Sequence, residues 1–380
     1  MNTKLTILYI CPDVFLGGST QSLINLIMAV SDSVEPIVLF PSKGVGYDKM
    51  KELGVECIVF PYVLLYELRS SSWRQVLLHP WRLLFVKHIR TDWKCARFVK
   101  QELKGKRVDI VHSNYSPVTI GCILSRMLHA RHVWHIREFV DLDFSINIYF
   151  GIPRLRWLVN QAGARVVISN QIYEHWRFER ENTWIIHNPI CRRSEACYMK
   201  RKESYLLFCS YFLTESKGAR FAIEAFGMSG IHENGYRLKL MGDCDETYKV
   251  LLMATALEYG VADKIDFVPC QKNVKPWFAR ATAFIMASRC EGLGRVTAEA
   301  MFYGCPVIGR ASGGTLDLIK DGVTGYLYDT IEECAQLIQK VCKNDQEKII
   351  LKAQEFAVNN LSQEVYGPKI MEVYNSVMKQ

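Results

Sequence analysis

Short apolar runs rich in β-branched residues alternate with longer stretches of helical period along the first half of the chain. Such runs predict buried strands, and the longer stretches predict the helices that connect them in a parallel sheet. The expected strands are Leu5–Cys11, Pro36–Phe40, Glu56–Phe60, Asp109–Ser113, His132–Ile136, Val166–Ser169 and Trp184–His187. Together they predict one complete doubly wound sheet.

The same alternation starts again after a polar stretch without periodicity, Cys191 to Ser204. The second set of expected strands is Tyr205–Ser210, Arg237–Met241, Lys264–Val268, Ala283–Ala287, Pro306–Gly309 and Gly325–Tyr328. We therefore predict an α/β protein with two doubly wound Rossmann-like domains, 1–190 and 191–358. A helical segment, 359–380, is expected to return toward the first domain. Because ligands of such sheets bind beyond the carboxyl ends of the strands, two facing domains predict a site in the cleft between them.

Composition agrees with an ordered protein that has two cores. The chain has 380 residues, of which 49% are hydrophobic, and this length suits two domains of ordinary size. Its thirteen cysteines show no paired C-x-x-C spacing, so we expect neither a zinc site nor a disulfide framework. The first apolar stretch, Leu5 to Ile10, is too short for a membrane span and lacks a signal-peptide cleavage site. A cytoplasmic location is therefore expected.

The densest motif follows the expected strand that ends at Ala287, and reads SRCEGLGRVTAEAMFYGCPVIGRASGGTLDLIKDGVTGYLY. Gly292 and Gly294 allow a tight turn at the strand exit, and the helix expected over 295–303 presents unpaired backbone amides to an anion. Glu291 before the helix and Glu299 inside it place two carboxylates where they can accept hydrogen bonds from sugar and ribose hydroxyls. The pattern predicts a diphosphate site flanked by hydroxyl-binding acids.

The full string resembles glycosyltransferase family 4, the group 1 type. The shared features are the Glu-x7-Glu spacing of Glu291 and Glu299, a Gly-x-Pro-Val-Ile strand and a Gly-Gly turn, with the close match over 283–328 and a weaker one over nearly the whole chain. The resemblance implies a GT-B fold, an acceptor-binding N-terminal domain and a C-terminal domain that holds a nucleoside-diphosphate sugar of UDP or GDP type. It also implies retention of anomeric configuration and no cofactor.

The resemblance implies a role for each residue of this chain that matches the family motif. The acid at Glu291 is expected to bind donor-sugar hydroxyls, and the acid at Glu299 the ribose. The amides around Gly292, Leu293, Gly294 and Arg295 are expected near the diphosphate and the sugar. Lys217, followed by a glycine as in the family, is expected at the diphosphate. The resemblance thus gives three candidate catalytic residues, which are His135, Glu291 and Lys217.

Two N-terminal features match the family as well. Gly17 and Gly18 match the glycine pair that lets the backbone approach the donor, although an ordinary strand-to-helix turn explains them too. His135 matches the histidine on the acceptor side of the reacting centre, with Arg137 and Glu138 as possible companions, although a strand-end histidine often has a purely structural role.

One expected contact is missing from the second domain. Lys217 alone would fit a solvated lysine at a helix start, and the arginine that the family places a few residues before it is absent. Arg295 and Arg220 are the candidates for supplying the lacking positive charge.

The motifs contain no spare carboxylate that would attack the sugar, so same-face transfer is expected by resemblance. In such a transfer the leaving phosphate accepts the acceptor proton while Lys217 and the helix amides stabilise its charge. Two Asp-x-Asp triplets, Asp141–Asp143 and Asp243–Asp245, raise the question of a divalent cation. The doubly wound halves argue against that use, and we predict that no metal is required.

Positive charge is concentrated between Arg69 and Arg107, where eleven Lys or Arg face two acids, a net of +9 in a chain whose total is +8. Part of the segment has two parallel helical stripes: apolar Phe85, Ile89, Trp93, Ala96, Val99 and Leu103, and basic Lys87, Arg90, Lys94, Arg97 and Lys104. A Rossmann helix would show part of this pattern. The preceding SSSWRQVLLHPWRLL interleaves tryptophans with cations, which is typical of segments that bind anionic lipid headgroups.

The predicted function is transfer of a hexose-type sugar to a lipid-linked or glycan acceptor, in bacterial surface polysaccharide or glycolipid assembly. The protein is expected to act peripherally at the inner face of the plasma membrane, and no nucleic acid partner is predicted. Two alternatives stay open, a nucleotide-sugar epimerase of the same fold and a non-catalytic nucleotide-sugar-binding subunit. A nicotinamide oxidoreductase is disfavoured because YICPDVFLGGS lacks the Gly-x-Gly-x-x-Gly order.

Overall fold

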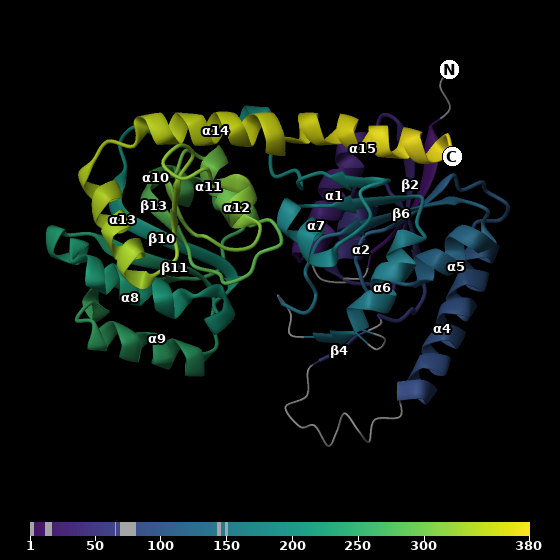
Figure 1. The fold of residues 1–380 in the computed structure, drawn as a ribbon, viewed down its shortest axis with the longest axis horizontal. Coiled ribbons are helices and arrows are strands. Elements are labelled where there is room, and N and C mark those ends of the chain that lie inside the picture. The colour runs from purple at the N-terminus through teal and green to yellow at the C-terminus, as the bar shows by residue number, and fades with distance from the viewer. Residues whose placement is uncertain (1–3, 12–16, 65, 69–80, 143–145, 149–150) are drawn as a thin grey trace. The chain divides into compact units, whose positions relative to one another are not determined.

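The computed structural model describes residues 4–11, 17–64, 66–68, 81–142, 146–148 and 151–380 (Figure 1). The chain divides into two compact units. Unit 1 contains 1–189 and 364–380, and unit 2 contains 190–363. Each unit is built on its own parallel sheet, which confirms the predicted α/β class with two Rossmann-like sheets.

Unit 1 has a seven-stranded parallel sheet in the order β3-β2-β1-β5-β6-β8-β9. Its strands are β1 Leu5–Ile10, β2 Val34–Phe40, β3 Glu56–Val59, β5 Ile110–Ser113, β6 Arg131–Ile136, β8 Ala164–Val167 and β9 Thr183–Ile185. Its helices are α1 Gly18–Val30, α2 Val45–Glu52, α4 Trp81–Glu102, α5 Ile120–Met127, α6 Gly151–Asn160, α7 Asn170–Trp176 and α15 Gln363–Met378. A short antiparallel pair, β4 Tyr66–Leu68 with β7 Ile146–Ile148, was not predicted.

Strand β1, inside the sheet of unit 1, is buried on both faces, as expected for a parallel sheet covered by helices. Ile7 and Tyr9 of β1 pack into a core with α1 and α15, whereas Leu8 and Ile10 pack into a core with α4 and α5. This alternation follows from the two-residue period of a strand. The strand order reverses between β1 and β5, so the carboxyl ends of these two strands form a topological switch point.

Unit 2 has a six-stranded parallel sheet in the order β12-β11-β10-β13-β14-β15. Its strands are β10 Glu203–Phe212, β11 Arg237–Asp243, β12 Ile265–Val268, β13 Ala281–Met286, β14 Val307–Arg310 and β15 Tyr326–Tyr328. Its helices are α8 Ala219–Ser229, α9 Glu246–Glu258, α10 Lys275–Arg280, α11 Arg295–Phe302, α12 Thr315–Leu318, α13 Ile331–Lys343 and α14 Glu347–Leu361. Here the order reverses between β10 and β13, so ligand-binding loops are expected after these two strands.

Helix α15 closes the chain as part of unit 1. Its side chains Ile370, Val373 and Val377 are fully buried in the core that contains Ile7. Gly367 lies so close to α1 that an added Cβ would meet the Ala29 carbonyl oxygen at 2.3 Å. The last residues of the chain therefore complete the core of the domain in which the chain began.

Candidate active site

The loops after β10 and β13, the two strands at the switch point of unit 2, meet at Gly218. This residue follows the 3-10 turn Glu215–Lys217 and caps α8 with a left-handed φ of 83°. A Cβ at Gly218 would lie 2.5 Å from the carbonyl oxygen of Ala287, which follows β13. The Arg289 amide also donates to the Ser216 carbonyl at 3.4 Å. Glycine at position 218 therefore allows the lysine-bearing turn to lie directly on the exit of β13.

This packing brings together two residues that are 74 positions apart in the sequence. The Lys217 ammonium donates a hydrogen bond to a carboxylate oxygen of Glu291 over 2.7 Å. Only 17% of the Glu291 side chain is exposed, whereas 39% of Lys217 is. The cation predicted at the diphosphate and the acid predicted at the sugar are thus in direct contact.

The glycine-rich turn after Glu291 is held by a second glycine pair. Gly313 has a φ of 54°, and a Cβ there would meet the Glu291 carbonyl oxygen at 2.7 Å. The Gly314 amide donates to that same oxygen over 2.7 Å. A Cβ at Gly314 would lie 2.4 Å from the Gly292 carbonyl oxygen. The Gly-Gly turn therefore packs against the segment that holds Glu291.

Helix α11 begins directly after this turn. Gly294 caps it with a left-handed φ of 84° and supplies no side-chain hydrogen bond to the amides at the helix start. The first amides of a helix lack partners within the helix and attract anions. One turn into α11, Glu299 accepts a hydrogen bond from Arg295 over 3.3 Å. Burial raises the pKa of Glu299, and the Arg295 charge lowers it by less.

In unit 1, His135 is the penultimate residue of β6 and is fully buried. Arg137 donates to its Nδ1 over 3.3 Å, so the proton of a neutral ring sits on Nε2. Burial, followed by the Arg137 charge, holds the pKa of His135 well below its usual value, which keeps the ring neutral. Nε2 has no hydrogen-bond partner among the described residues. His135 is therefore a neutral ring whose Nε2–H is not used by any described residue.

Sequence reasoning missed the residues that hold Arg137. Its guanidinium donates to Asn114 Oδ1 over 2.9 and 2.8 Å, and to Asn188 Oδ1. Asn114 follows the end of β5, and Asn188 follows the end of β9. Because ligands of a parallel sheet bind beyond such strand ends, this position in the sequence could have identified both asparagines. His112 lies on β5, two residues before Asn114, and its Nδ1 is 2.9 Å from the Tyr374 hydroxyl.

The glycine pair of unit 1 does not depend on a special backbone conformation. Gly17 caps α1 with φ of −74° and ψ of 179°, and Gly18 is the first residue of that helix. A Cβ at Gly18 would have nothing within 4 Å. Backbone strain therefore explains neither glycine, and crowding by the described residues does not explain Gly18.

The Asp-x-Asp triplets have local structural partners. Asp245 caps α9 by accepting from the Tyr248 amide at 2.8 Å, and Asp243 accepts from the Cys270 amide at 3.2 Å. Asp141 lies 2.9 Å from His175, whereas Asp143 lies outside the described residues. No cluster of three metal-binding side chains occurs in the described part of the chain. The metal-free mechanism stays a prediction.

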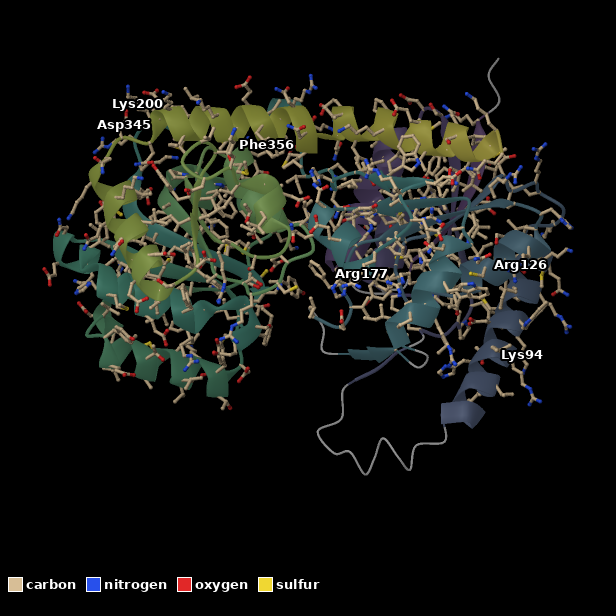
Figure 2. All side chains as sticks on the ribbon, in the orientation of Figure 1. Lys94, Arg126, Arg177, Lys200, Asp345 and Phe356 are labelled. Carbon is tan, nitrogen blue, oxygen red and sulfur yellow. The ribbon has the colours of Figure 1, made fainter. Side chains whose placement is uncertain are left out.

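The basic segment divides into parts with different surroundings. Residues 69–80 lie outside the described residues. On α4, Ala96 and Val99 are fully buried, but Ile89 and Trp93 are 38% and 47% exposed. The apolar stripe is therefore buried at Ala96 and Val99 and exposed at Ile89 and Trp93. Beside the exposed end, Lys94 projects from α4 (Figure 2).

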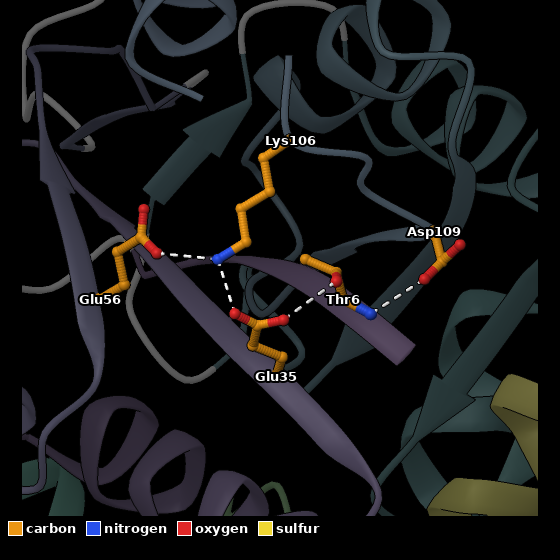
Figure 3. Close-up of polar contacts among 5 residues, drawn as sticks. All are labelled: Thr6, Glu35, Glu56, Lys106 and Asp109. Atoms are coloured by element: carbon orange, nitrogen blue, oxygen red, sulfur yellow. Dashed lines mark hydrogen bonds and ion pairs between the residues drawn. The ribbon is translucent and has the colours of Figure 1, made fainter. Parts of the chain in front are cut away.

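The last cations of this segment are neutralised within unit 1. Lys106 contacts Glu35 at 2.6 Å and Glu56 at 3.1 Å, which ties β2 to β3, and Glu35 also accepts from Thr6 (Figure 3). The Glu35 hydrogen bond raises the pKa of Lys106. Arg107 likewise pairs with Asp109 at 2.9 Å. Several exposed cations of the segment, among them Lys87, Arg90 and Lys94, lie on α4. No helix of the described residues is long and apolar enough to cross a membrane.

Comparison with known proteins identifies the class. The fold matches the crystal structure of Anabaena HepE in complex with UDP, with a TM-score of 0.79 and 18% identity. The match covers 98% of this chain and 100% of the HepE chain. The lipopolysaccharide outer core galactosyltransferase WaaB matches over 98% of this chain and 99% of its own, with a TM-score of 0.69 and 18% identity. The protein thus has the GT-B fold of glycosyltransferases.

The family follows from the sequence of unit 2. Residues 196–356 match the family described as glycosyl transferases group 1. The N-acetyl-α-D-glucosaminyl L-malate synthase of Bacillus anthracis is 23% identical over 84% of both chains. A lipopolysaccharide core biosynthesis glycosyltransferase of Rhizobium meliloti is 29% identical, over 43% of this chain and 47% of that protein. Most of unit 2 thus has the sequence of glycosyl transferases group 1, that is, of glycosyltransferase family 4.

Proposed function

We propose that this glycosyltransferase moves a hexose-type sugar from a UDP-sugar to a lipid-linked or glycan acceptor, with retention, in bacterial surface polysaccharide or glycolipid assembly. The observation that carries the proposal is the contact of Lys217 with Glu291 on the glycine-rich turn of unit 2. UDP is favoured because HepE was solved with UDP and with UDP-glucose. The acceptor class follows from the Rhizobium lipopolysaccharide relative and from WaaB.

In the proposed reaction the bond between the anomeric carbon and the diphosphate oxygen breaks, and a bond to the acceptor oxygen forms on the same face. The acceptor proton moves to a phosphate oxygen of the leaving UDP. Lys217 and the first amides of α11 stabilise the charge that grows on that diphosphate. Glu291 orients the sugar through its hydroxyls. The Nε2 proton of His135 is available to a sugar or acceptor oxygen, and the neutral ring is not required as a base.

Membrane contact is proposed for the exposed end of α4. Val86, Ile89 and Trp93 are large exposed apolar side chains spaced on one face of the helix, and exposed Lys87, Arg90 and Lys94 lie beside them. Apolar and basic side chains in adjacent stripes suit an anionic bilayer surface. The protein would then act peripherally at the cytoplasmic face of the plasma membrane, where a lipid-linked acceptor is presented.

The enzymatic proposal is tested by incubating the purified chain with labelled UDP-hexoses and bacterial membrane lipid extract, with and without chelator. We expect UDP release together with labelled lipid or glycan, unaffected by chelator. An absence of turnover with every donor would contradict the proposal. Loss of activity in chelator would contradict the metal-free mechanism. Interconversion of UDP-sugars without transfer would favour the epimerase alternative.

The membrane proposal has its own test. Flotation with vesicles of phosphatidylglycerol and phosphatidylethanolamine should recover the wild-type chain, and the triple variant Lys87→Gln, Arg90→Gln, Lys94→Gln should lose most of this binding. The matched control changes exposed lysines of α14 and α15, namely Lys348, Lys352 and Lys369, to Gln. Equal flotation of the two triple variants would defeat the assignment to α4.

A further inference from the structure

The donor site carries less positive charge than its ligand requires. A UDP-sugar has one negative charge on each of its two phosphates, and the departing UDP gains about one more. In the turn between β10 and α8, Lys217 is the single cation. Ser210, Tyr211 and Phe212 stand a few residues earlier, where the family has its arginine. Lys217 is itself paired with Glu291. A second cation near the diphosphate is therefore needed to match its charge.

Arg220 is the nearest candidate in the sequence, and its surroundings argue against it. Its Nη2 contacts Glu215 at 2.7 Å, and its Nε lies 3.9 Å from Glu224. The hydrogen bond to Glu215 raises the pKa of Arg220. Its side chain is 42% exposed. The charge of Arg220 is thus matched by two carboxylates, although its Nε is buried without a hydrogen-bond partner among the described residues.

Arg295 has a different environment. It is the first residue of α11, directly after the left-handed Gly294. One of its terminal nitrogens, Nη2, donates to Glu299 over 3.3 Å, which is a long contact for a charged pair. The other, Nη1, is buried and has no hydrogen-bond partner among the described residues. A buried guanidinium nitrogen without an acceptor is costly, so its presence at a ligand-binding turn points to an acceptor supplied by the ligand.

We propose that Arg295 binds the diphosphate of the donor and replaces the missing arginine of the turn before Lys217. This inference rests on the proposed function, because it takes the ligand to be a nucleoside-diphosphate sugar. Lys217 is paired to Glu291 and Arg295 to Glu299, so the charges of these four side chains balance. When the donor binds, its phosphate oxygens contact Lys217 and Arg295 in place of the two carboxylates.

This exchange also frees the two carboxylates. Glu291 is then available to accept hydrogen bonds from the donor sugar, and Glu299 from the ribose. Arg295 and Glu299 are one helical turn apart, so a guanidinium bound to the phosphate next to the ribose stays within reach of Glu299. Binding thus replaces two internal ion pairs by contacts to one ligand. The nucleotide would be recognised by its diphosphate and its ribose together.

The test compares affinities for UDP and for uridine by ligand-observed NMR titration. Arg295→Leu should weaken UDP binding about tenfold to 100-fold, the loss expected for one charged hydrogen bond. Its affinity for uridine, which has no phosphate, should stay within about twofold of wild type. Arg295→Lys should recover part of the UDP affinity. Arg220→Leu serves as the matched control and should leave both affinities unchanged.

Each other outcome has a defined meaning. A wild-type chain that binds no UDP or GDP would overturn the proposed function itself. Wild-type UDP affinity in Arg295→Leu would overturn the role of Arg295 alone. Equal losses for UDP and uridine would show that Arg295 only shapes the loop, which also overturns the role. If Arg295→Leu does not fold, as judged by circular dichroism, Arg295→Gln is measured in its place.

Discussion

Substitution of Gly218 by alanine tests the packing on which the donor site depends. Two costs follow from the structure. The left-handed φ of 83° costs a residue with a Cβ about 1–2 kcal/mol. The added Cβ would also lie 2.5 Å from the Ala287 carbonyl oxygen, where ordinary contact begins at 3.4 Å, so the backbone must retreat by about 0.9 Å. Such overpacking costs about 1–3 kcal/mol.

The expected total loss is therefore about 2–5 kcal/mol in the free energy of unfolding of unit 2. Gly235→Ala is the matched control, because Gly235 has a similar φ of 81° but nothing within 4 Å of an added Cβ. It should lose about 1–2 kcal/mol from the backbone conformation alone. Urea unfolding followed by circular dichroism gives both values. A folded Gly218→Ala should also bind UDP more weakly, since Lys217 precedes the shifted residue.

The reasoning would be refuted by a Gly218→Ala variant no less stable than Gly235→Ala. In that case the loop after β10 does not press on the exit of β13 as the structure places it. A variant with the predicted loss of stability and unchanged UDP affinity would contradict the link from this packing to the Lys217 position.

Three further predictions concern single side chains. Lys217→Met should lower kcat about 100-fold to 1000-fold, because the leaving diphosphate loses stabilisation. The control Lys352→Met, at an exposed position, should leave kcat unchanged. Equal kcat values for the two variants would remove Lys217 from the mechanism. Arg137→Met leaves the acceptors Asn114 and Asn188 without their donor, so we expect a stability loss of about 1–3 kcal/mol in urea unfolding. Its kcat should fall while KM for the donor stays nearly constant, and an unchanged kcat would show that His135 does not depend on Arg137. Burial lowers the pKa of His132 from 6.5 to about 3, so the unfolded chain binds the extra proton and stability falls as pH drops below 6.5. Between pH 7 and 5 this histidine should account for about 2 kcal/mol of lost unfolding free energy, and His132→Gln should show a correspondingly weaker pH dependence.

The strands and the donor loop were predictable because their signals are local. Runs such as Leu5–Ile10 are apolar at nearly every position, since the sheet is buried on both faces. The helix expected over 295–303 is α11, Arg295–Phe302, because a glycine turn and a glycine after the helix mark its two ends. The Glu-x7-Glu spacing needs no tertiary information, and its residues lie on one turn and one helix.

Other features depend on contacts between distant positions. Tyr374 of α15 contacts His112 across 262 residues, and no periodicity signals that pairing. The β4–β7 pair has strands of three residues, which is too short for a pattern of alternation. On α4 the apolar stripe continues unbroken in the sequence, although Ile89 and Trp93 are exposed and Ala96 and Val99 are buried. Whether an apolar side chain is covered is decided by its neighbours in space.

The most direct measurement is the rate of label transfer from a UDP-hexose to membrane lipid extract by the wild-type chain and by Glu291→Gln. This variant keeps the size of the side chain and removes the charge that Lys217 contacts. Transfer by the wild type, with the anomeric configuration retained, and a rate about 100-fold lower in Glu291→Gln are the predicted results. Inverted configuration, or equal rates for the two proteins, would contradict a retaining transferase whose donor is held at Lys217 and Glu291.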